Sequence, residues 1–338
     1  MALLEIEDLH VDFPSQGAVM RAVDGVSLSL DEGEVLGIVG ESGSGKSVTM
    51  LALMGLVAYP GRVRAKALRF AGHDLLKASD AEHRKLIGKD VAMIFQDPTT
   101  SLNPCFTVGF QLCETLRLHL RMDRKTALHR ATELLELVGI AAASSRLKDF
   151  PHQMSGGMNQ RVMIAMAIAC NPRLLIADEP TTALDVTIQA QILDLLRGLQ
   201  KDRGMALVLV THNMGVVAEM ARRVAVMYAG QVLEERFADS LFAAPQHPYT
   251  AALLAAMPER SDGVSRLATI PGVVPGLYDR PAGCLFAPRC TYATDASCQR
   301  RPELRPWQDG QVRCHFPLGD PGRDAALARE RSVGATAT

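Results

Sequence analysis

The chain has 338 residues, of which 48% are hydrophobic and 22% are charged, so it is long enough for one large domain with an appendage or for two domains. Its formal net charge of -1 provides no basic field to hold nucleic acid or an anionic membrane surface. The acidic beginning MALLEIEDLH is unlike a signal peptide, and no apolar run approaches the roughly 18 residues of a spanning helix. We therefore expect a cytoplasmic protein with reduced cysteines.

Short apolar, β-rich runs alternate with helical patterns along most of the chain. Continuous apolar strands separated by helices are typical of a buried, largely parallel sheet, so the sequence predicts an α/β fold. The runs are EVLGIVG (34–40), VAMIFQ (91–96), RLLIAD (173–178), MALVLVT (205–211) and VAVMYAG (224–230).

The first motif that carries chemistry, GESGSGKS (40–47), follows the first strand and leads into the helical run SVTMLALMGL. It fits the phosphate-loop pattern G-x-x-x-x-G-K-[ST], in which backbone N–H groups and a helix N-terminus surround a phosphate. We expect Lys46 to neutralise the β- and γ-phosphates and Ser47 to ligate Mg²⁺; the alternative is a chance glycine–serine loop. The predicted nucleotide-binding residues here are Gly40, Ser42, Gly43, Ser44, Gly45, Lys46, Ser47 and Val48.

A helical insertion follows, from residue 97 to about residue 158. VGFQLCETLRLHL and ALHRATELLELVGI repeat apolar residues at intervals of three and four. The insertion ends in MSGGMNQR (154–161), which starts a further helical run. Ser155, Gly156 and Gly157 form a second helix N-terminus that can hold an anion, or a plain serine N-cap. Since one phosphate loop already exists, an anion site here is best used across an interface.

The strand LLIADEP (174–180) ends in two carboxylates. Asp178 suits a Mg²⁺ contact, and Glu179 is placed to polarise an attacking water. Successive strand side chains point to opposite faces, so both acids reach one site only if the chain turns after Asp178. The alternative is that the two acids only cap the strand end.

With these motifs the chain resembles ABC-transporter ATPases, whose LSGGQ signature is similar to MSGGMNQR. In that family the signature loop binds the γ-phosphate of ATP held by the opposing subunit. The resemblance implies that Gln96 contacts Mg²⁺ and the attacking water, and that His212 in LVTHN bonds the γ-phosphate. One departure is Asn213, where the importer pattern usually has Asp, so a modest change in turnover is expected.

The resemblance assigns two further residues. TALD (182–185) is similar to the loop that places Asp185 at the dimer seam, and Phe13 is the candidate that stacks on adenine. We expect a site competent for hydrolysis, because the chain has Lys46, Gln96, Asp178, Glu179 and His212.

After about residue 245 the predicted strands stop, HPYTAALLAAMP predicts one short helix, and Pro and Gly become frequent. IPGVVPG and GCLFAPRCTYATDASCQRRPEL resemble the C-terminal extension of ATP-binding subunits of oligopeptide, dipeptide and nickel importers, with the dipeptide-permease type most similar. In that group four cysteines hold an iron–sulfur cluster. The ligands here would be Cys284, Cys290, Cys298 and Cys314. The spacing lacks a C-x-x-C knuckle, so a 4Fe-4S cluster is preferred over zinc or free thiols. The remaining cysteines, Cys105, Cys113 and Cys170, are expected in the core.

The resemblance implies a P-loop ABC cassette with a mostly parallel sheet core and an antiparallel β part, followed by a small irregular C-terminal module that contains the cysteines. The expected domains are 1–245 (cassette, with helical subdomain 97–158), 246–320 (extension) and 321–338 (flexible tail).

The implied function is ATP-driven import of dipeptides or short oligopeptides. The implied partners are a related second ABC ATPase in a heterodimer, two membrane permease subunits and an extracytoplasmic peptide-binding protein, with no nucleic acid. The expected location is peripheral, at the cytoplasmic face of the inner membrane. A nickel or metal importer of the same group stays open, as does a soluble ABC ATPase acting on ribosomes or nucleic acid.

Overall fold

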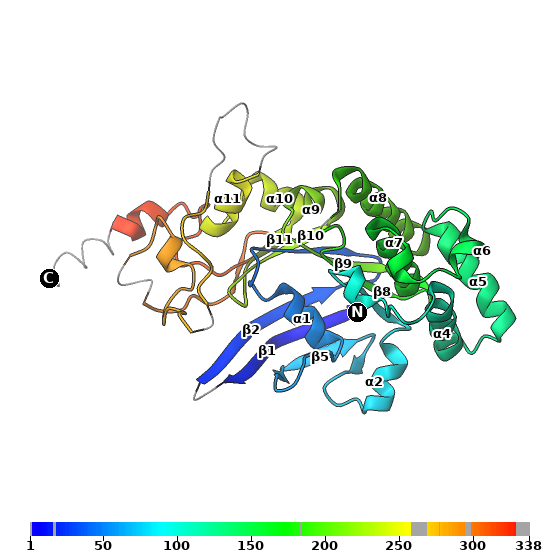
Figure 1. Cartoon of the computed structure of the whole chain (residues 1–338). Coiled ribbons are helices and arrows are strands. Elements are labelled where there is room, and N and C mark those ends of the chain that lie inside the picture. Colours follow the sequence, from blue (N-terminus) through cyan, green and yellow to red (C-terminus); the bar gives the residue numbers. More distant parts are fainter. Residues whose placement is uncertain are drawn as a thin grey trace. The chain divides into compact units, whose positions relative to one another are not determined.

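The computed structural model describes residues 2–15, 18–182, 184–257, 269–276, 278–294 and 299–328. Within these ranges every helix is too short or too polar to cross a lipid bilayer. The chain forms two compact units, each assembled from segments far apart in the sequence (Figure 1). Unit 1 comprises Met1–Leu3, Leu30–Val35 and Ala71–Val210, and unit 2 comprises Leu4–Ser29, Leu36–Phe70 and Thr211–Thr338.

A parallel sheet of three strands forms the centre of unit 1. Strand β8 (Leu174–Asp178) lies between β7 (Val91–Ile94) and β9 (Ala206–Thr211). Leu174 is opposite Val91 on one side and opposite Ala206 on the other. Every residue of the three strands is buried, which explains their continuous apolar sequence and confirms the predicted parallel pairing.

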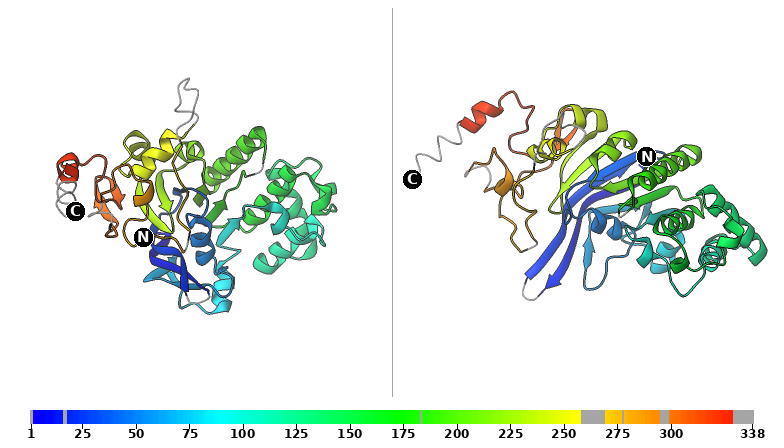
Figure 2. Two further views of the ribbon diagram at one scale, coloured as in Figure 1. Left: turned by 60° about the vertical axis from the view of Figure 1, so that its left-hand side comes forward. Right: turned by 45° about the horizontal axis from the view of Figure 1, so that its top comes forward.

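Helices α4, α5 and α7 of unit 1 pack on one another, and α6 packs on α5. Their contact faces are apolar at helical spacing: Leu112 and Leu116 of α4 and Leu134 and Leu135 of α5 are fully buried. Figure 2 shows these teal and green helices as one group. The bounds are β6 (His73–Asp74), α2 (Asp80–Leu86), α3 (Pro98–Ser101), α4 (Val108–Leu120), α5 (Arg124–Leu137), α6 (Ala143–Arg146), η1 (Pro151–Gln153), α7 (Gly156–Ile168) and α8 (Val186–Arg203).

Unit 2 contains two sets of strands. In the first, the long strands β1 (Leu4–Ser15) and β2 (Ala18–Leu30) are neighbours, and β1 also pairs antiparallel with β4 (Arg62–Arg64) and β5 (Ala67–Phe70). This is the antiparallel part that the family resemblance implied. In the second, β3 (Val35–Val39) pairs parallel with β10 (Arg223–Tyr228), and β11 (Gln231–Phe237) pairs antiparallel with β10.

The C-terminal part of unit 2 adds strands that the sequence analysis did not predict. Strand β13 (Gly310–Val312) pairs antiparallel with β11, and β12 (Arg305–Trp307) pairs with β13. The prediction that strands stop after about residue 245 is therefore wrong. These three-residue strands contain Pro306 and have no apolar alternation, so they give no periodic signal.

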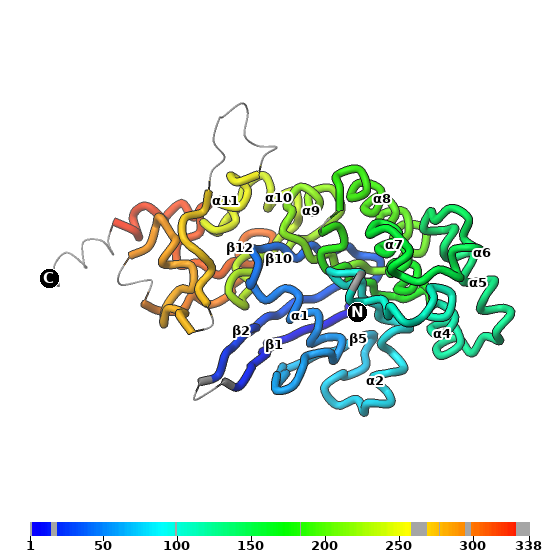
Figure 3. Tube along the Cα trace, viewed as in Figure 1, coloured from blue at the N-terminus to red at the C-terminus, as the bar shows by residue number. Residues whose placement is uncertain are grey.

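Short helices cover the remainder of unit 2. They include α1 (Lys46–Leu53), α9 (Met214–Met220), α10 (Ala238–Ala243), α11 (Pro248–Ala255) and η3 (Ala287–Arg289). The orange trace that contains η3 lies beside the yellow α11 (Figure 3), and the rings of Phe286 and Tyr249 are 5.3 Å apart. The predicted short helix in HPYTAALLAAMP is thus present, and aromatic packing fixes the extension against it.

Candidate active site

The predicted phosphate loop joins β3 to α1 in unit 2. Helix α1 begins at Lys46, and its N-cap Gly45 has a φ of 96°. A Cβ atom at Gly45 would also approach the Ala22 carbonyl oxygen to 2.8 Å, so both backbone angle and space require glycine. The loop therefore has the strand, turn and helix that phosphate binding needs.

Lys46 is buried at the centre of this loop. Its Nζ donates hydrogen bonds to the carbonyl oxygens of Gly40 (2.8 Å) and Glu41 (3.0 Å), and to Ser44 Oγ (3.3 Å). The ammonium group is thus held by acceptors of the loop itself, which phosphate oxygens can replace. Ser47, the predicted Mg²⁺ ligand, is half-buried in the first turn of α1.

Gln96 and Glu179 meet in unit 1, although 83 positions separate them in the sequence. Gln96 Nε2 donates a hydrogen bond of 3.1 Å to Glu179 Oε2, and Thr182 Oγ1 donates one of 2.8 Å to the same oxygen. Two donors therefore hold one carboxylate oxygen. The sequence predicts Gln96 as the last residue of its strand. In the structure β7 ends at Ile94, so Gln96 lies two residues beyond the strand.

Asp178 and Glu179 sit where β8 ends. Asp178 is the last residue of the strand and is 4% exposed. Glu179 has a φ of 46°, and its N–H donates to the Val210 carbonyl oxygen at 2.8 Å. The chain thus turns at Glu179 itself, as the placement of both acids required. Left-handed backbone is uncommon at a non-glycine residue and costs conformational energy.

Ser155 is the N-cap of α7: its Oγ accepts a hydrogen bond from the Met158 N–H at 3.3 Å. Gly156 and Gly157 are the first two helical residues. A Cβ atom on Gly156 would meet no atom within 4 Å, so the space in front of this helix N-terminus is open. A Cβ atom on Gly157 would lie 3.3 Å from Ile188 Cγ2, which brings the start of α7 beside the start of α8.

Asp185 and Asn213 are also N-caps. Asp185 Oδ1 accepts from the Ile188 N–H (3.0 Å) at the start of α8, and Asn213 Oδ1 accepts from the Gly215 N–H (2.9 Å) at the start of α9. An amide serves as well as a carboxylate in this position, which gives Asn213 a local structural role. His212 is exposed beside it, directly after β9. Phe13 is half-buried in β1.

Three of the four tail cysteines converge in unit 2. Cys284, Cys290 and Cys314 line one small cavity together with His247 and His315. Burial, with the nearby Cys284 and Cys290, raises the pKa of the Cys314 thiol to about 12. Cys298 lies outside the described residues, and among those described no group of three or more His, Cys, Asp or Glu is arranged to hold a metal ion.

The other cysteines differ in exposure. Cys170 is buried and Cys113 is half-buried, whereas Cys105 is exposed, so the prediction that Cys105 belongs to the core is wrong. It lies between Pro104 and Phe106 in a turn before α4, where apolar neighbours in sequence do not imply burial.

Glu41, an acidic residue inside the phosphate loop, is not among the site residues expected from the sequence. Arg289 donates two hydrogen bonds to its carboxylate (2.9 and 3.1 Å), and Tyr249 Oη accepts one from the Glu41 N–H (3.0 Å). A carboxylate inside an anion-binding loop requires a nearby cation that compensates its charge. The acidic residue in the loop is therefore the feature of the sequence from which such a partner could be predicted.

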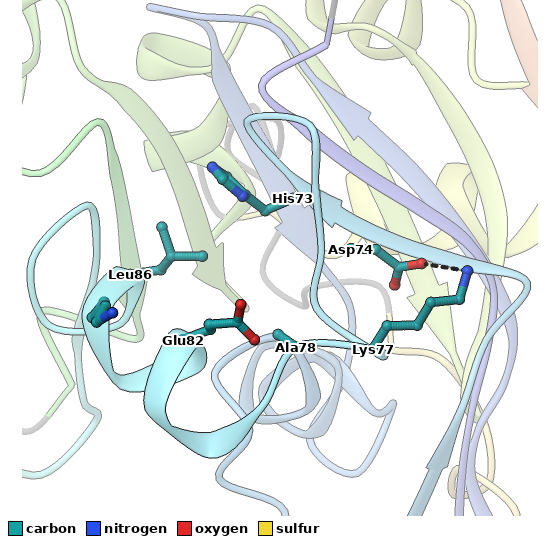
Figure 4. Close-up of a pocket in the computed structure, with 7 residues that line it drawn as sticks. His73, Asp74, Lys77, Ala78, Glu82 and Leu86 are labelled. Atoms are coloured by element: carbon teal, nitrogen blue, oxygen red, sulfur yellow. Dashed lines mark ion pairs between the residues drawn. The ribbon is translucent and has the colours of Figure 1, made fainter.

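Unit 1 also has a hollow between β6 and α2 (Figure 4). Both of its carboxylates have local partners: Asp74 pairs with Lys77 at 3.2 Å, and Glu82 forms a capping box with Ser79 at the start of α2. A larger groove of ≈ 970 Å³ runs along α4 and α5 and includes the half-exposed Phe110.

Comparison with known proteins gives two family matches. Residues 23–182 match the ABC transporter family, and residues 233–298 match the oligopeptide/dipeptide transporter C-terminal region. The chain is 59% identical over 324 residues to the dipeptide transport ATP-binding protein DppD of Escherichia coli (strain K12), covering 96% of this chain and 99% of that protein. It is 51% identical over 304 residues to the oligopeptide transport ATP-binding protein OppD of Bacillus subtilis (strain 168), covering 89% and 85%.

Solved structures are similar over the cassette. The dimeric ATP-binding cassette MJ0796, in a post-hydrolysis state bound to ADP and Pi, has a TM-score of 0.61 and 28% identity, covering 70% of this chain and 98% of that chain. CbiO1 from Clostridium perfringens, part of the ABC transporter complex cbiONQ, has a TM-score of 0.59 and 27% identity, covering 72% and 91%. The phosphate loop and the pairing of Gln96 with Glu179 agree with these matches. The chain therefore belongs to the ABC transporter family of ATP-binding proteins and has the C-terminal region of the oligopeptide/dipeptide transporters.

Proposed function

We propose that this ABC ATPase is the energy-coupling subunit of an importer for dipeptides or short oligopeptides. The observation that carries the proposal is the Glu179 carboxylate, held by Gln96 and Thr182 in a chain that also has a complete phosphate loop. The dipeptide and oligopeptide transport names of the relatives support the substrate class.

In this proposal the phosphate loop binds ATP in cis. The backbone N–H groups from Gly40 to Val48 surround the phosphates, Lys46 exchanges its loop acceptors for phosphate oxygens, and Phe13 stacks on adenine. Asp178 suits a Mg²⁺ site because its carboxylate is buried at a strand end, and Ser47, Gln96 and Asp178 would hold the ion. The ion would neutralise charge on the transferred phosphoryl group.

Hydrolysis then depends on Glu179 and His212. A water oxygen attacks the γ-phosphorus while the bond to the β–γ bridging oxygen breaks, which gives ADP and phosphate. Glu179 polarises this water, and its bonds from Gln96 and Thr182 fix the direction in which the carboxylate points. His212, exposed at the end of β9, would bond the γ-phosphate.

The signature segment would serve a second cassette. Ser155, Gly156 and Gly157 start α7 with open space in front of Gly156, which suits the γ-phosphate of ATP bound by a partner subunit. Asp185, at the neighbouring start of α8, would lie at the seam. We propose a heterodimer with a related ABC ATPase.

The membrane partners would dock on the helical part of unit 1. The groove along α4 and α5 is lined by Phe110, Leu118 and Leu128, all at least 49% exposed, and would accept a short helix of one permease subunit. The chain would thus be peripheral at the cytoplasmic face of the inner membrane, with an extracytoplasmic peptide-binding protein delivering cargo. The cassette would comprise residues 1–245, with helical subdomain 97–158, the extension 246–320 and the tail 321–338.

We further propose that the tail cysteines hold a 4Fe-4S cluster. Three thiols share one cavity, and metal ligation would remove the proton that burial keeps on Cys314. Cys284, Cys290, Cys298 and Cys314 would be the ligands, and the cluster would close the extension as a structural element. Anaerobically purified protein should contain iron and sulfide, with loss of both in Cys290→Ser; stoichiometric zinc without sulfide would refute the cluster.

The function is tested by co-expressing the chain with its permeases and second ATPase and reconstituting the complex in proteoliposomes. We expect ATPase activity stimulated by the loaded peptide receptor, and its loss in Glu179→Gln. The matched control Glu133→Gln, on the exposed side of α5, should leave both import and hydrolysis unchanged. Transport of nickel but not of dipeptides, or co-purification with ribosomes in place of permeases, would overturn the proposal.

A further inference from the structure

An acidic residue occupies the phosphate loop of unit 2, and a cation from the C-terminal extension neutralises it. Arg289 Nη1 donates to Glu41 Oε1 at 2.9 Å, and Nη2 donates to Oε2 at 3.1 Å, a bidentate pair. The Arg289 side chain is 4% exposed and that of Glu41 is 30% exposed. The pair joins positions 248 residues apart in the sequence, and its guanidinium is buried while its carboxylate is partly exposed.

The remaining contacts of Glu41 fix its place in the loop. Its N–H donates to Tyr249 Oη at 3.0 Å, and its carbonyl oxygen accepts from Lys46 Nζ at 3.0 Å. The side chain, the N–H and the carbonyl of one loop residue are therefore all held. Lys46 is the expected phosphate ligand, so the position of Glu41 bears directly on the phosphate cradle.

Arg289 also makes contacts with residues other than Glu41, and these contacts fix its side chain. Arg289 Nε donates to the Pro271 carbonyl oxygen at 2.8 Å, and the guanidinium lies over the ring of Tyr228 at 5.7 Å. Three residues earlier, Phe286 packs edge-on against Tyr228. Cys290 follows Arg289 directly and lines the cysteine cavity. The folding of the cysteine-lined segment thus decides where this guanidinium sits.

We propose that Arg289 is a positioning residue for the nucleotide site: through its pair with Glu41, the C-terminal extension sets the affinity of the phosphate loop for a nucleoside triphosphate. This inference rests on the proposed function. Without Arg289, the Glu41 carboxylate would be an uncompensated negative charge beside the triphosphate, and one anchor of the loop would be lost.

The test measures binding of a fluorescent ATP analogue to the purified full-length chain. Charged hydrogen bonds of this kind contribute enough that Arg289→Gln should weaken binding by about tenfold or more. Arg289→Lys, which restores the positive charge, should recover part of the affinity. Glu41→Gln combined with Arg289→Gln should bind more tightly than Arg289→Gln alone, because the unpaired carboxylate is then absent.

Arg301→Gln is the matched control. Arg301 is also in the extension and forms an ion pair of 2.7 Å with Asp24, a carboxylate outside the phosphate loop. Its loss should leave ATP-analogue binding unchanged, even if the protein is slightly less stable. If Arg289 only stabilised the fold, Arg289→Gln would lower the melting temperature, as a loss of stability in Arg301→Gln would. The affinity of the folded fraction for the ATP analogue would then be unaltered.

Each outcome of the binding test either supports or contradicts the role of Arg289. Equal affinity of wild type and Arg289→Gln, or no gain on adding Glu41→Gln, would overturn the inference while leaving the ATPase function standing. If Arg289→Gln does not fold, Arg289→Lys and its combination with Glu41→Gln provide the same comparison. Failure of the wild-type chain to bind the analogue would refute the proposed function itself.

Discussion

Substitutions at Ser155 can separate its structural role as a helix cap from its proposed functional role in phosphate binding. Its hydroxyl already caps α7 through the Met158 N–H at 3.3 Å, so a change at this position affects stability whether or not the segment binds a phosphate. Loss of a serine N-cap costs about 0.5 to 2 kcal/mol, and the long bond here places Ser155→Ala at about 1 kcal/mol or less. For a chain of 338 residues, the melting temperature should fall by about 1 to 2 °C at most.

The proposed contact between Ser155 and the γ-phosphate predicts a much larger effect on hydrolysis. A hydrogen bond to a charged group contributes about 1.5 to 3 kcal/mol, so Ser155→Ala should lower the ATPase rate of the assembled pair by about tenfold or more. Ser155→Asp separates the two roles, because Asp caps a helix as well as Ser but repels the γ-phosphate. This variant should keep the wild-type melting temperature and lose ATPase activity.

The measurements are thermal unfolding followed by circular dichroism and phosphate release by the complex. Ser79→Ala is the matched control, because Ser79 Oγ caps α2 of the same unit with a bond of the same length, 3.3 Å. It should lose stability and keep ATPase activity. A folded Ser155→Asp variant that hydrolyses ATP at the wild-type rate would show that Ser155 is only a helix cap, and the reasoning would fail.

Three other predictions follow from single sites. Gly156→Ala adds a Cβ that meets no atom of the chain, so stability should hold or rise by up to about 1 kcal/mol, while nucleotide-driven pairing, measured by size-exclusion chromatography with ATP, should weaken. Asn213→Asp keeps the cap of α9, so the melting temperature should be unchanged, and a changed melting temperature would contradict the capping role. At pH 8 a thiol reagent followed by mass spectrometry should label the exposed Cys105 well before Cys170. Burial raises the pKa of Cys170 to about 11, so its thiolate fraction should grow only as the pH approaches 11, and rapid labelling of Cys170 at pH 8 would contradict this.

Local patterns were enough to predict the apolar strands β3, β7, β8, β9 and β10 and the phosphate loop. The continuous apolar runs of β7 to β9 indicate burial on both faces, and the glycines and Lys46 of the loop are recognisable because backbone angle and phosphate chemistry restrict those positions directly. The turn at Glu179 was required by the alternation of side chains along β8, and its φ of 46° confirms it.

Tertiary structure alone decided which side chains meet. The sequence contains the acid Glu41 in a phosphate loop, which indicates that a cation is needed, but 36 Lys and Arg residues are available to supply it. Only the packing of Phe286 and the path of the extension bring Arg289 to that carboxylate. The edge strands β12 and β13 were missed for a related reason, since they are held by backbone pairing to β11 and not by an apolar pattern of their own. Contacts between distant segments depend on the whole chain, so no local stretch encodes them.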